Sequence, residues 1–189
     1  MIRFSAVRIV IYVRPQLDHI VSLYSTVLRT GYKGSLEEFI ANKMRKGFRD
    51  YFDLRGIITQ WGRVFGPENI IVRPYKGTDP ETGSLGDFCQ VMGIDLTSGD
   101  WKMPTRANVS ITAEGQNLLL KANQEDVLTP DQHRELAKWA EAHHAGQGAM
   151  PDLALAQSFQ SLFQAGNAWV IQTYFPEHPE YLQPRWPID

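Results

Sequence analysis

Two short stretches of apolar, β-branched residues stand out in the hydrophobic pattern of this chain. The first is residues 7–13 (VRIVIYV) and the second is residues 69–75 (NIIVRPY). Runs of this length and composition are typical of strands that are buried on both faces of a parallel sheet. We therefore expect two parallel strands whose faces are both covered by helices.

Between and after these strands, apolar residues recur at helical spacing. Pro15 fits a first helical position and Gly31 fits a helix end, which predicts a helix over 15–30. Ser35 and Glu38 have the spacing of a capping box and predict a second helix start. Further helices are predicted at 50–65, from the N-cap Ser84 to Gly93, at 111–122, at 129–144 with Thr129 as the N-cap, and at 152–165.

The alternation of strands and helices is typical of a doubly wound α/β fold. Two strands make a poor sheet on their own, so either further strands lie in 95–110 or the chain is the C-terminal part of a larger design. With 189 residues, 43% of them hydrophobic, we expect a single domain over 1–175. Four prolines exclude a regular helix from 176–189, which we expect to form a tail along the surface.

Composition excludes several classes of protein. No run approaches the roughly 18 apolar residues of a membrane span, and the first residues do not form a signal peptide. The single cysteine, Cys89, excludes an internal disulfide framework and a Cys-based metal cluster, and no histidine pair has zinc-site spacing. The formal net charge of −2 provides no general nucleic-acid footprint. We expect a cytoplasmic protein with no metal site and no nucleic-acid partner.

Arg14 and Ser22 carry the clearest candidate chemistry. Arg14 directly follows the first predicted strand, at the end where open α/β sheets bind their ligands, and its guanidinium is a bidentate donor suited to phosphate. The N-terminus of the next helix adds backbone amides. Ser22 lies roughly 10 Å further along the helix axis, so one phosphate reaches both residues only beside the helix. A surface ion pair for Arg14 and a solvated Ser22 explain the same pattern.

The pattern Tyr12-Val13-Arg14, followed after seven residues by Ser22, resembles the 3′-phosphate-binding motif of the sulfotransferases. These enzymes transfer a sulfuryl group from 3′-phosphoadenosine 5′-phosphosulfate (PAPS) and release 3′-phosphoadenosine 5′-phosphate (PAP). The resemblance implies a P-loop-NTPase-like sulfotransferase fold, a carbohydrate-type hydroxyl acceptor, and binding of the nucleotide's 3′-phosphate by Arg14 and Ser22.

The succession of elements agrees with this resemblance over most of residues 7–115. The segments 61–66, 69–75 and 87–95 are similar to the helix, strand and helix that follow the motif in these enzymes. Residues 108–114 and the C-terminus are similar to bacterial sulfotransferase-like proteins associated with surface polysaccharides.

The start of the chain departs from the family pattern. Sulfotransferases open with a strand and a Pro- and Gly-containing loop that holds the 5′-phosphosulfate, and the catalytic base follows that loop. This chain has no glycine before Gly31 and only six residues before the first predicted strand. We therefore expect an N-terminally incomplete and inactive chain in which no catalytic residue is assigned. The alternative is a non-catalytic remnant that binds a nucleotide or a partner protein.

Two features suggest partners. The strand at 7–13 is expected to have an open edge, which predicts a homodimer paired through that edge, unless residues 1–6 or the tail cover it. Residues 29–49 hold six cations against Glu37 and Glu38, a local balance of +4. Such a surface would attract a polyanionic nucleotide or an acidic glycan, although a solvated helix face and loop give the same pattern.

Overall fold

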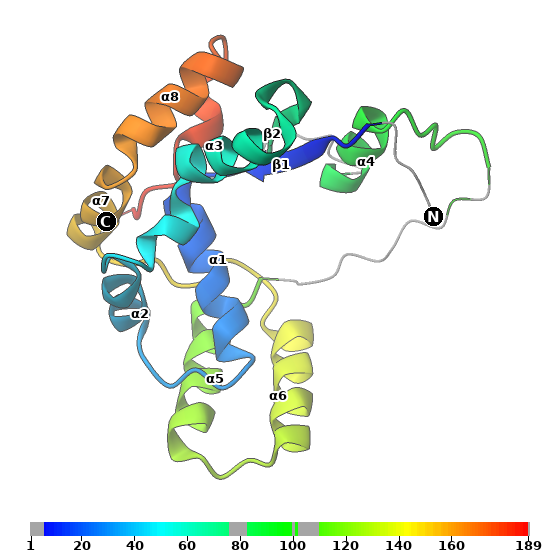
Figure 1. Ribbon diagram of the computed structural model, residues 1–189. Helices are drawn as coiled ribbons and strands as arrows, with labels where there is room; N and C mark the ends of the chain where they lie inside the picture. Colours follow the sequence, from blue (N-terminus) through cyan, green and yellow to red (C-terminus); the bar gives the residue numbers. More distant parts are fainter. Residues whose placement is uncertain (1–5, 76–82, 100, 102–109, 189) are drawn as a thin grey trace. The chain divides into compact units, whose positions relative to one another are not determined.

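A computed structural model describes residues 6–75, 83–99, 101 and 110–188 (Figure 1). It is a mostly helical α/β structure with a small parallel sheet. The two strands are β1 (Ile9–Val13) and β2 (Ile70–Pro74). The α-helices are α1 (Gln16–Leu28), α2 (Leu36–Lys43), α3 (Leu54–Phe65), α4 (Gly83–Val91), α5 (Ala113–Glu125), α6 (Pro130–His143), α7 (Leu153–Ser161) and α8 (Gln164–Tyr174). Three 3₁₀ turns cover Arg49–Phe52, Pro67–Asn69 and Pro179–Leu182.

The chain divides into two compact units, each assembled from separate segments. The sheet unit comprises Met1–Pro15, Asp50–Pro104 and Phe163–Gln183. The helical unit comprises Gln16–Arg49, Thr105–Leu162 and Pro184–Asp189. Because neither unit follows a single boundary in the sequence, the prediction of one domain over 1–175 stays a prediction.

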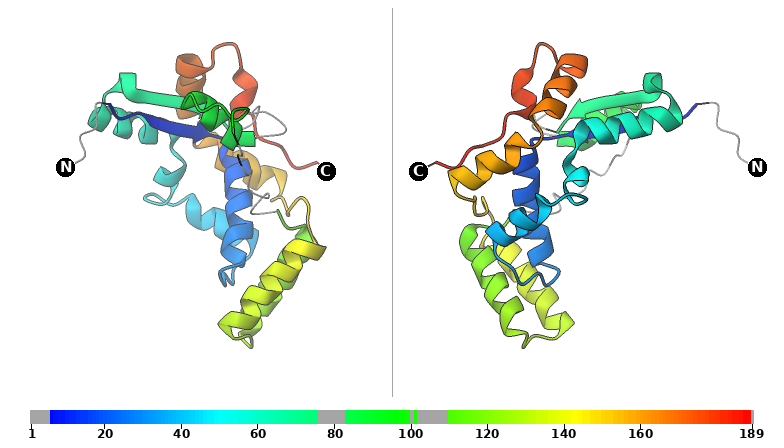
Figure 2. Two further views of the ribbon diagram at one scale, coloured as in Figure 1. Left: turned by 90° about the vertical axis from the view of Figure 1, so that its right-hand side faces the viewer. Right: turned by 60° about the vertical axis from the view of Figure 1, so that its left-hand side comes forward.

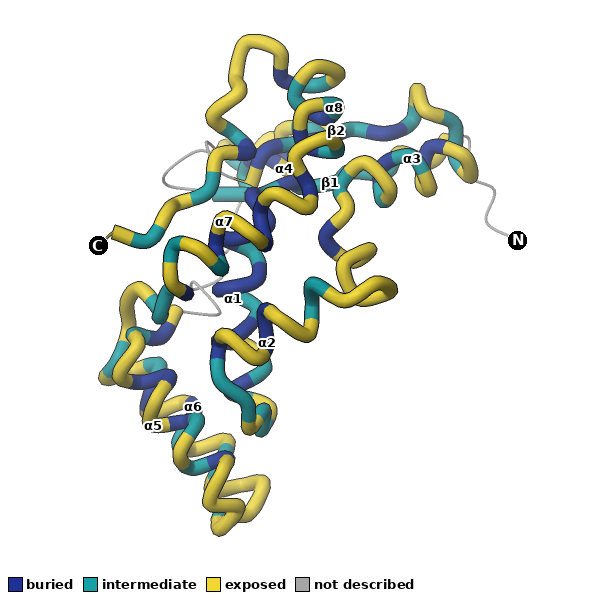
Figure 3. Tube along the Cα trace, turned by 90° about the vertical axis from the view of Figure 1, so that its left-hand side faces the viewer, coloured by how far each residue is buried: buried dark blue, intermediate teal, exposed yellow. Residues whose placement is uncertain are grey.

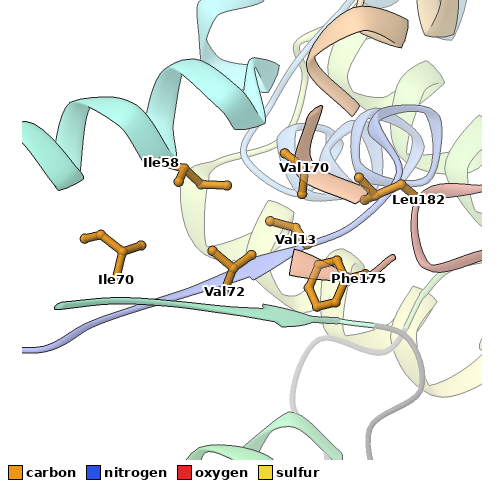
Figure 4. Close-up of a cluster of buried hydrophobic side chains, with 7 residues drawn as sticks. All are labelled: Val13, Ile58, Ile70, Val72, Val170, Phe175 and Leu182. Atoms are coloured by element: carbon orange, nitrogen blue, oxygen red, sulfur yellow. The ribbon is translucent and has the colours of Figure 1, made fainter. Parts of the chain in front are cut away.

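In the sheet unit, β1 and β2 pair in parallel, with Ile9 opposite Ile70 and Val13 opposite Pro74. Successive side chains of a strand point to opposite faces. On one face, Ile9, Ile11 and Val13 of β1 and Ile70 and Val72 of β2 pack against α3, α8 and the last 3₁₀ turn (Figure 4). The buried side chains of this apolar cluster are Val13, Ile58, Ile70, Val72, Val170, Phe175 and Leu182.

The other face of the sheet corrects one expectation. Both strands were expected to be buried on both faces, but Val10, Tyr12, Ile71 and Arg73 are only half-buried. The physical reason is that α4 holds this face through a polar contact and buries only Asp87 and Cys89 of its own residues.

The helical unit is built on α1, whose buried residues contact α2, α5 and α7. Helices α5 and α6 lie side by side as a hairpin (Figures 1 and 2). Buried Asn123 of α5 donates hydrogen bonds to the carbonyls of Leu28 (2.9 Å) and Tyr32 (2.8 Å). The predicted capping box of Ser35 and Glu38 is confirmed, and so is Thr129 as the N-cap of α6.

Several predicted boundaries differ from the structure. The helix predicted at 50–65 begins only at Leu54, because Asp53 caps it by accepting a hydrogen bond from Gly56 (3.0 Å). The helix predicted at 152–165 is two helices that break at 162–163. Ser84 is not a cap, since α4 begins at Gly83.

The C-terminal tail is only partly a surface segment. Pro179 opens a 3₁₀ turn that places Leu182, 5% exposed, in the apolar cluster. The further strands predicted in 95–110 fall largely outside the described residues. Within the described part of the chain, β1 has β2 as its strand partner and no second one. The predicted homodimer through the remaining edge of β1 stays a prediction.

Candidate functional site

Polar side chains gather on the half-buried face of the sheet, at the carboxyl ends of both strands. Tyr12 and Arg14 are two residues apart at the end of β1. Arg73 and Tyr75 are two residues apart at the end of β2, with the arginine before the tyrosine. Tyr12 lies opposite Arg73 in the strand register. The Arg14 guanidinium carbon lies 5.2 Å from the centre of the Tyr75 ring. Together with Asp87 of α4, these four residues form what we call the polar cluster.

Asp87 is the centre of the polar cluster. Its carboxylate accepts a hydrogen bond from the Tyr12 hydroxyl (2.6 Å) and from Nε of Arg73 (3.1 Å to each oxygen). Nη2 of Arg73 completes the ion pair with the same carboxylate. The Asp87 side chain is 8% exposed, whereas that of Arg73 is 37% exposed. The carboxylate therefore fixes the orientation of a guanidinium that still reaches solvent.

Protonation follows from these contacts. The hydrogen bonds from Arg73 lower the pKa of Asp87, and the same contact raises the pKa of Arg73. Burial and the hydrogen bond to Asp87 raise the pKa of Tyr12 to about 12. Asp87 is therefore charged and Tyr12 neutral at pH 7, so Tyr12 donates its proton to the carboxylate.

Arg14 lies where the sequence predicts it, directly after β1 and beside the end of β2. The backbone N–H of Tyr75 donates to the carbonyl of Val13 at 2.8 Å, which joins the two strand ends next to Arg14. The carboxyl end of a parallel pair is where α/β folds bind ligands. The half-buried Arg14 brings a permanent positive charge and a forked donor to this edge.

Ser22 belongs to the other unit. It is half-buried in α1, and its backbone carbonyl accepts a hydrogen bond from the Thr26 hydroxyl (3.4 Å). The buried serine of this helix is Ser25, whose hydroxyl accepts a hydrogen bond from Gln116. Because Arg14 and Ser22 lie in different compact units, their joint action on one phosphate stays a prediction.

The sequence analysis missed Arg73, Tyr75 and Asp87 as members of the site. A signal was present for two of them, since Arg73 and Tyr75 repeat the alternation of Tyr12 and Arg14 on the second strand. Asp87 carried no such signal, because it lies 75 residues from Tyr12 in the sequence. Cys89 is buried in α4.

Two kinds of feature are absent from the described residues. No helix there is long and apolar enough to cross a membrane. No group of three or more histidine, cysteine, aspartate or glutamate side chains in the described ranges is arranged to hold a metal ion.

Comparisons with known proteins identify one distant relative. The chain is 30% identical over 125 residues to a protein of Archaeoglobus fulgidus that is named only "Uncharacterized protein". This match covers 65% of the chain but 32% of the relative, so the chain spans about a third of the relative's length. No family model matches the chain. No solved structure matches it either. These comparisons give the chain no family and no activity.

Proposed function

We propose that this protein is sulfotransferase-like and binds PAPS, or its product PAP, at the carboxyl end of the β1–β2 sheet. In this proposal Arg14 and Ser22 bind the 3′-phosphate of the nucleotide, and the acceptor is a hydroxyl group of a carbohydrate. The proposal extends the resemblance of the segment from Tyr12 to Ser22 to the 3′-phosphate motif of that family.

One observation carries the proposal: Arg14 stands at the carboxyl end of a parallel strand pair. β1 and β2 run parallel. Helix α3, which lies between them in the sequence, packs against both strands. Helix α1 begins two residues after Arg14, so its first backbone amides follow the guanidinium directly along the chain. A phosphate is the ligand that suits a forked cation and, by itself, the N-terminus of a helix.

The second arginine of the cluster supports an anionic ligand as well. Asp87 holds Arg73 through a side-on ion pair, and the Arg73 side chain remains 37% exposed at the end of β2. The Tyr75 ring beneath the Arg14 guanidinium favours a flat, oriented cation, because the face of an aromatic ring attracts positive charge. Arg14 is therefore positioned before a ligand arrives.

In the sulfotransferase reaction that the resemblance implies, the acceptor oxygen attacks the sulfur of PAPS in line with the leaving phosphate. The new S–O bond forms as the bond between sulfur and the bridging oxygen breaks. PAP leaves with that electron pair, and the hydroxyl proton passes to a general base. Arg14 holds the nucleotide through a phosphate remote from the sulfur, so it orients the donor and does not act on the reacting atoms.

Calorimetric titration with PAP tests the proposal. Arg14→Ala is expected to weaken PAP binding by about 1.5–3 kcal/mol, the range for a hydrogen bond to a charged group. Ser22→Ala is expected to cost about 0.5–1.5 kcal/mol. Adenosine 5′-phosphate lacks the 3′-phosphate, so its binding should not depend on either residue.

A matched control is Arg63→Ala, which removes one exposed positive charge from α3 of the same unit. It should bind PAP like the wild type. Circular dichroism of each variant checks that the fold is retained. If wild type and Arg14→Ala bind PAP equally, or if adenosine 5′-phosphate binds as well as PAP, the 3′-phosphate assignment is wrong.

A further inference from the structure

A second charged surface lies in the helical unit, where α2 ends. Residues Lys43–Arg49, which we call the basic turn, read KMRKGFR and contain four cations and no carboxylate. Apart from the half-buried Lys43 and Met44, every residue of the turn is exposed (Figure 3). The nearest acidic residue along the chain, Asp50, follows Arg49, so the local charge is strongly positive even when Asp50 is counted.

The backbone of the basic turn is folded tightly on itself. The N–H groups of Phe48 (3.1 Å) and Arg49 (3.3 Å) both donate to the carbonyl of Arg45. Gly47 has a φ of +94°, and a Cβ built there would meet no atom within 4 Å. The turn is therefore compact, and it is open to solvent beside Gly47.

An aromatic side chain stands among the cations. Phe48 is 55% exposed, an unusual position for a phenylalanine in water. The Lys43 ammonium lies 5.3 Å from the centre of the Phe48 ring and 5.4 Å from that of Phe39. Lys43 thus connects the exposed Phe48 ring to the buried Phe39 ring of α2.

The cations of the basic turn differ from those that precede them in the same unit. Arg29 pairs with Glu141 at 2.8 Å, and Lys33 pairs with Asp126 at 3.0 Å. Arg45, Lys46 and Arg49 form no ion pair with any carboxylate of the described residues. Their charge is available to an external anion.

We propose that the basic turn binds the surface of an anionic lipid bilayer, with Phe48 entering the headgroup region and the four cations contacting lipid phosphates. The shape of the turn favours a bilayer over a nucleic acid. A single-stranded nucleic acid is held by grooves that track its backbone and by several stacking rings. A compact turn of seven residues with one exposed ring is too short to track a nucleic-acid backbone, but it can contact a flat bilayer. Clustered cations beside an exposed apolar side chain are typical of such peripheral binding.

Sedimentation with lipid vesicles tests this proposal. The intact chain should bind vesicles of 70% phosphatidylcholine and 30% phosphatidylglycerol, and not vesicles of phosphatidylcholine alone. The binding should weaken as NaCl is raised from about 50 to 300 mM, because salt screens exposed charges. Arg45→Ala combined with Lys46→Ala should lower the partition coefficient about 25-fold, since each cation near an anionic surface contributes about a factor of five. Phe48→Ser should lower it about tenfold.

The matched control is Arg134→Ala combined with Lys138→Ala, which removes two exposed cations from α6 and gives the same change in net charge. The partition coefficient of this control should lie within about twofold of that of the wild type, because salt screens cations that are remote from the bilayer. A nitroxide on Phe48→Cys should report immersion in the headgroup region, with Cys89 buried and unlabelled.

Three results would overturn the proposal: equal loss of binding in the control, equal binding to neutral vesicles, or tighter binding of single-stranded DNA than of anionic vesicles by the same turn. The proposal is independent of nucleotide binding, because none of the substituted residues belongs to the polar cluster. Either proposal can therefore fail alone.

Discussion

The two faces of the β1–β2 sheet are held by different physics, although the same ten residues build both. On one face, Val13 and Val72 pack into an apolar cluster with α3 and α8, and the contacts are non-directional. On the other face, Tyr12 and Arg73 reach α4 through one carboxylate, Asp87, in hydrogen bonds with fixed geometry. Because successive side chains of a strand point to opposite faces, the same two strands present an apolar face and a polar face.

The two faces should contribute differently to the stability of the sheet unit and to the orientation of its side chains. Burial of apolar area stabilises in proportion to the area removed from water, whereas a partly buried ion pair offsets much of its attraction by desolvation. We therefore expect the apolar face to hold the sheet unit together. We expect the polar face to orient Arg73 and α4 but to contribute less to the free energy of unfolding. Substitutions on each face, with stability as the readout, test this difference.

Removal of a large side chain from the apolar face should have the largest effect. Phe175→Ala is expected to lower the free energy of unfolding by about 3–5 kcal/mol, because Phe175 is 7% exposed and its loss leaves a cavity in the cluster. Urea denaturation measures this change. Val64→Ala on the exposed side of α3 is the control and should change stability by less than about 0.5 kcal/mol. If both variants are equally stable, the apolar cluster does not hold the unit.

Removal of the Arg73 guanidinium should have the second-largest effect. Arg73→Ala leaves the Asp87 carboxylate buried with only Tyr12 as its donor, and we expect a loss of about 1.5–3 kcal/mol in urea denaturation. The double variant Arg73→Met with Asp87→Leu removes both charges. It should regain most of that loss, because a buried pair replaced by apolar residues is often neutral. A double variant less stable than Arg73→Ala alone would mean that the ion pair itself stabilises the face.

The acid limb of the stability curve distinguishes the faces by pH. The pKa of Asp87 is lower in the folded protein than its usual value of about 3.9. Its contribution is therefore fully present above pH 4 and is lost as the pH falls through the lowered pKa. Wild type should lose more stability than Asp87→Asn between pH 5 and pH 2 in urea titrations. Parallel pH curves for the two proteins would show that the contact with Arg73 does not lower the pKa of Asp87.

Local signals in the sequence were sufficient for the strands and for most helix ends. Both strands were predicted to within two residues at each end, since their apolar runs are short and bounded by prolines and polar residues. Ser35 and Thr129 were predicted as N-caps, because a cap acts over three residues. The break between α7 and α8 was not predicted, as neither proline nor glycine marks it and the apolar spacing continues across it.

Contacts between distant segments could not be predicted in the same way. The strand-end position of Arg14 follows from residues within one strand and turn, so it was found. The hydrogen bond from Tyr12 to Asp87 depends on how α4 is placed on the sheet, and no local pattern encodes that placement. This contact also explains why one face of the sheet is only half-buried. Helix α4 presents Asp87 to that face and does not cover the face with apolar side chains.

The smallest effect is expected at Tyr12, where one hydroxyl is removed from the polar face. Tyr12→Phe keeps the ring and deletes the hydrogen bond to Asp87, so we expect a loss of about 0.5–1.5 kcal/mol at pH 8. Burial, together with the bond to Asp87, raises the pKa of Tyr12 to about 12, above its usual value of about 10. Its contribution is therefore present below pH 10 and is lost as the pH rises toward 12. The difference between wild type and Tyr12→Phe should shrink over that interval.

Tyr24 provides the matched control for this measurement. Burial, with smaller effects of Glu37 and Tyr32, also raises its pKa to about 12, but its hydroxyl donates to the carbonyl of Gly34 (3.2 Å) and not to a carboxylate. Phenolate absorbance should show one late-titrating tyrosine fewer in each single variant. Only Tyr12→Phe should also flatten the acid limb that Asp87 controls, because only Tyr12 shares that carboxylate. If Tyr24→Phe alters the acid limb as much as Tyr12→Phe does, the acid sensitivity does not belong to the polar face of the sheet.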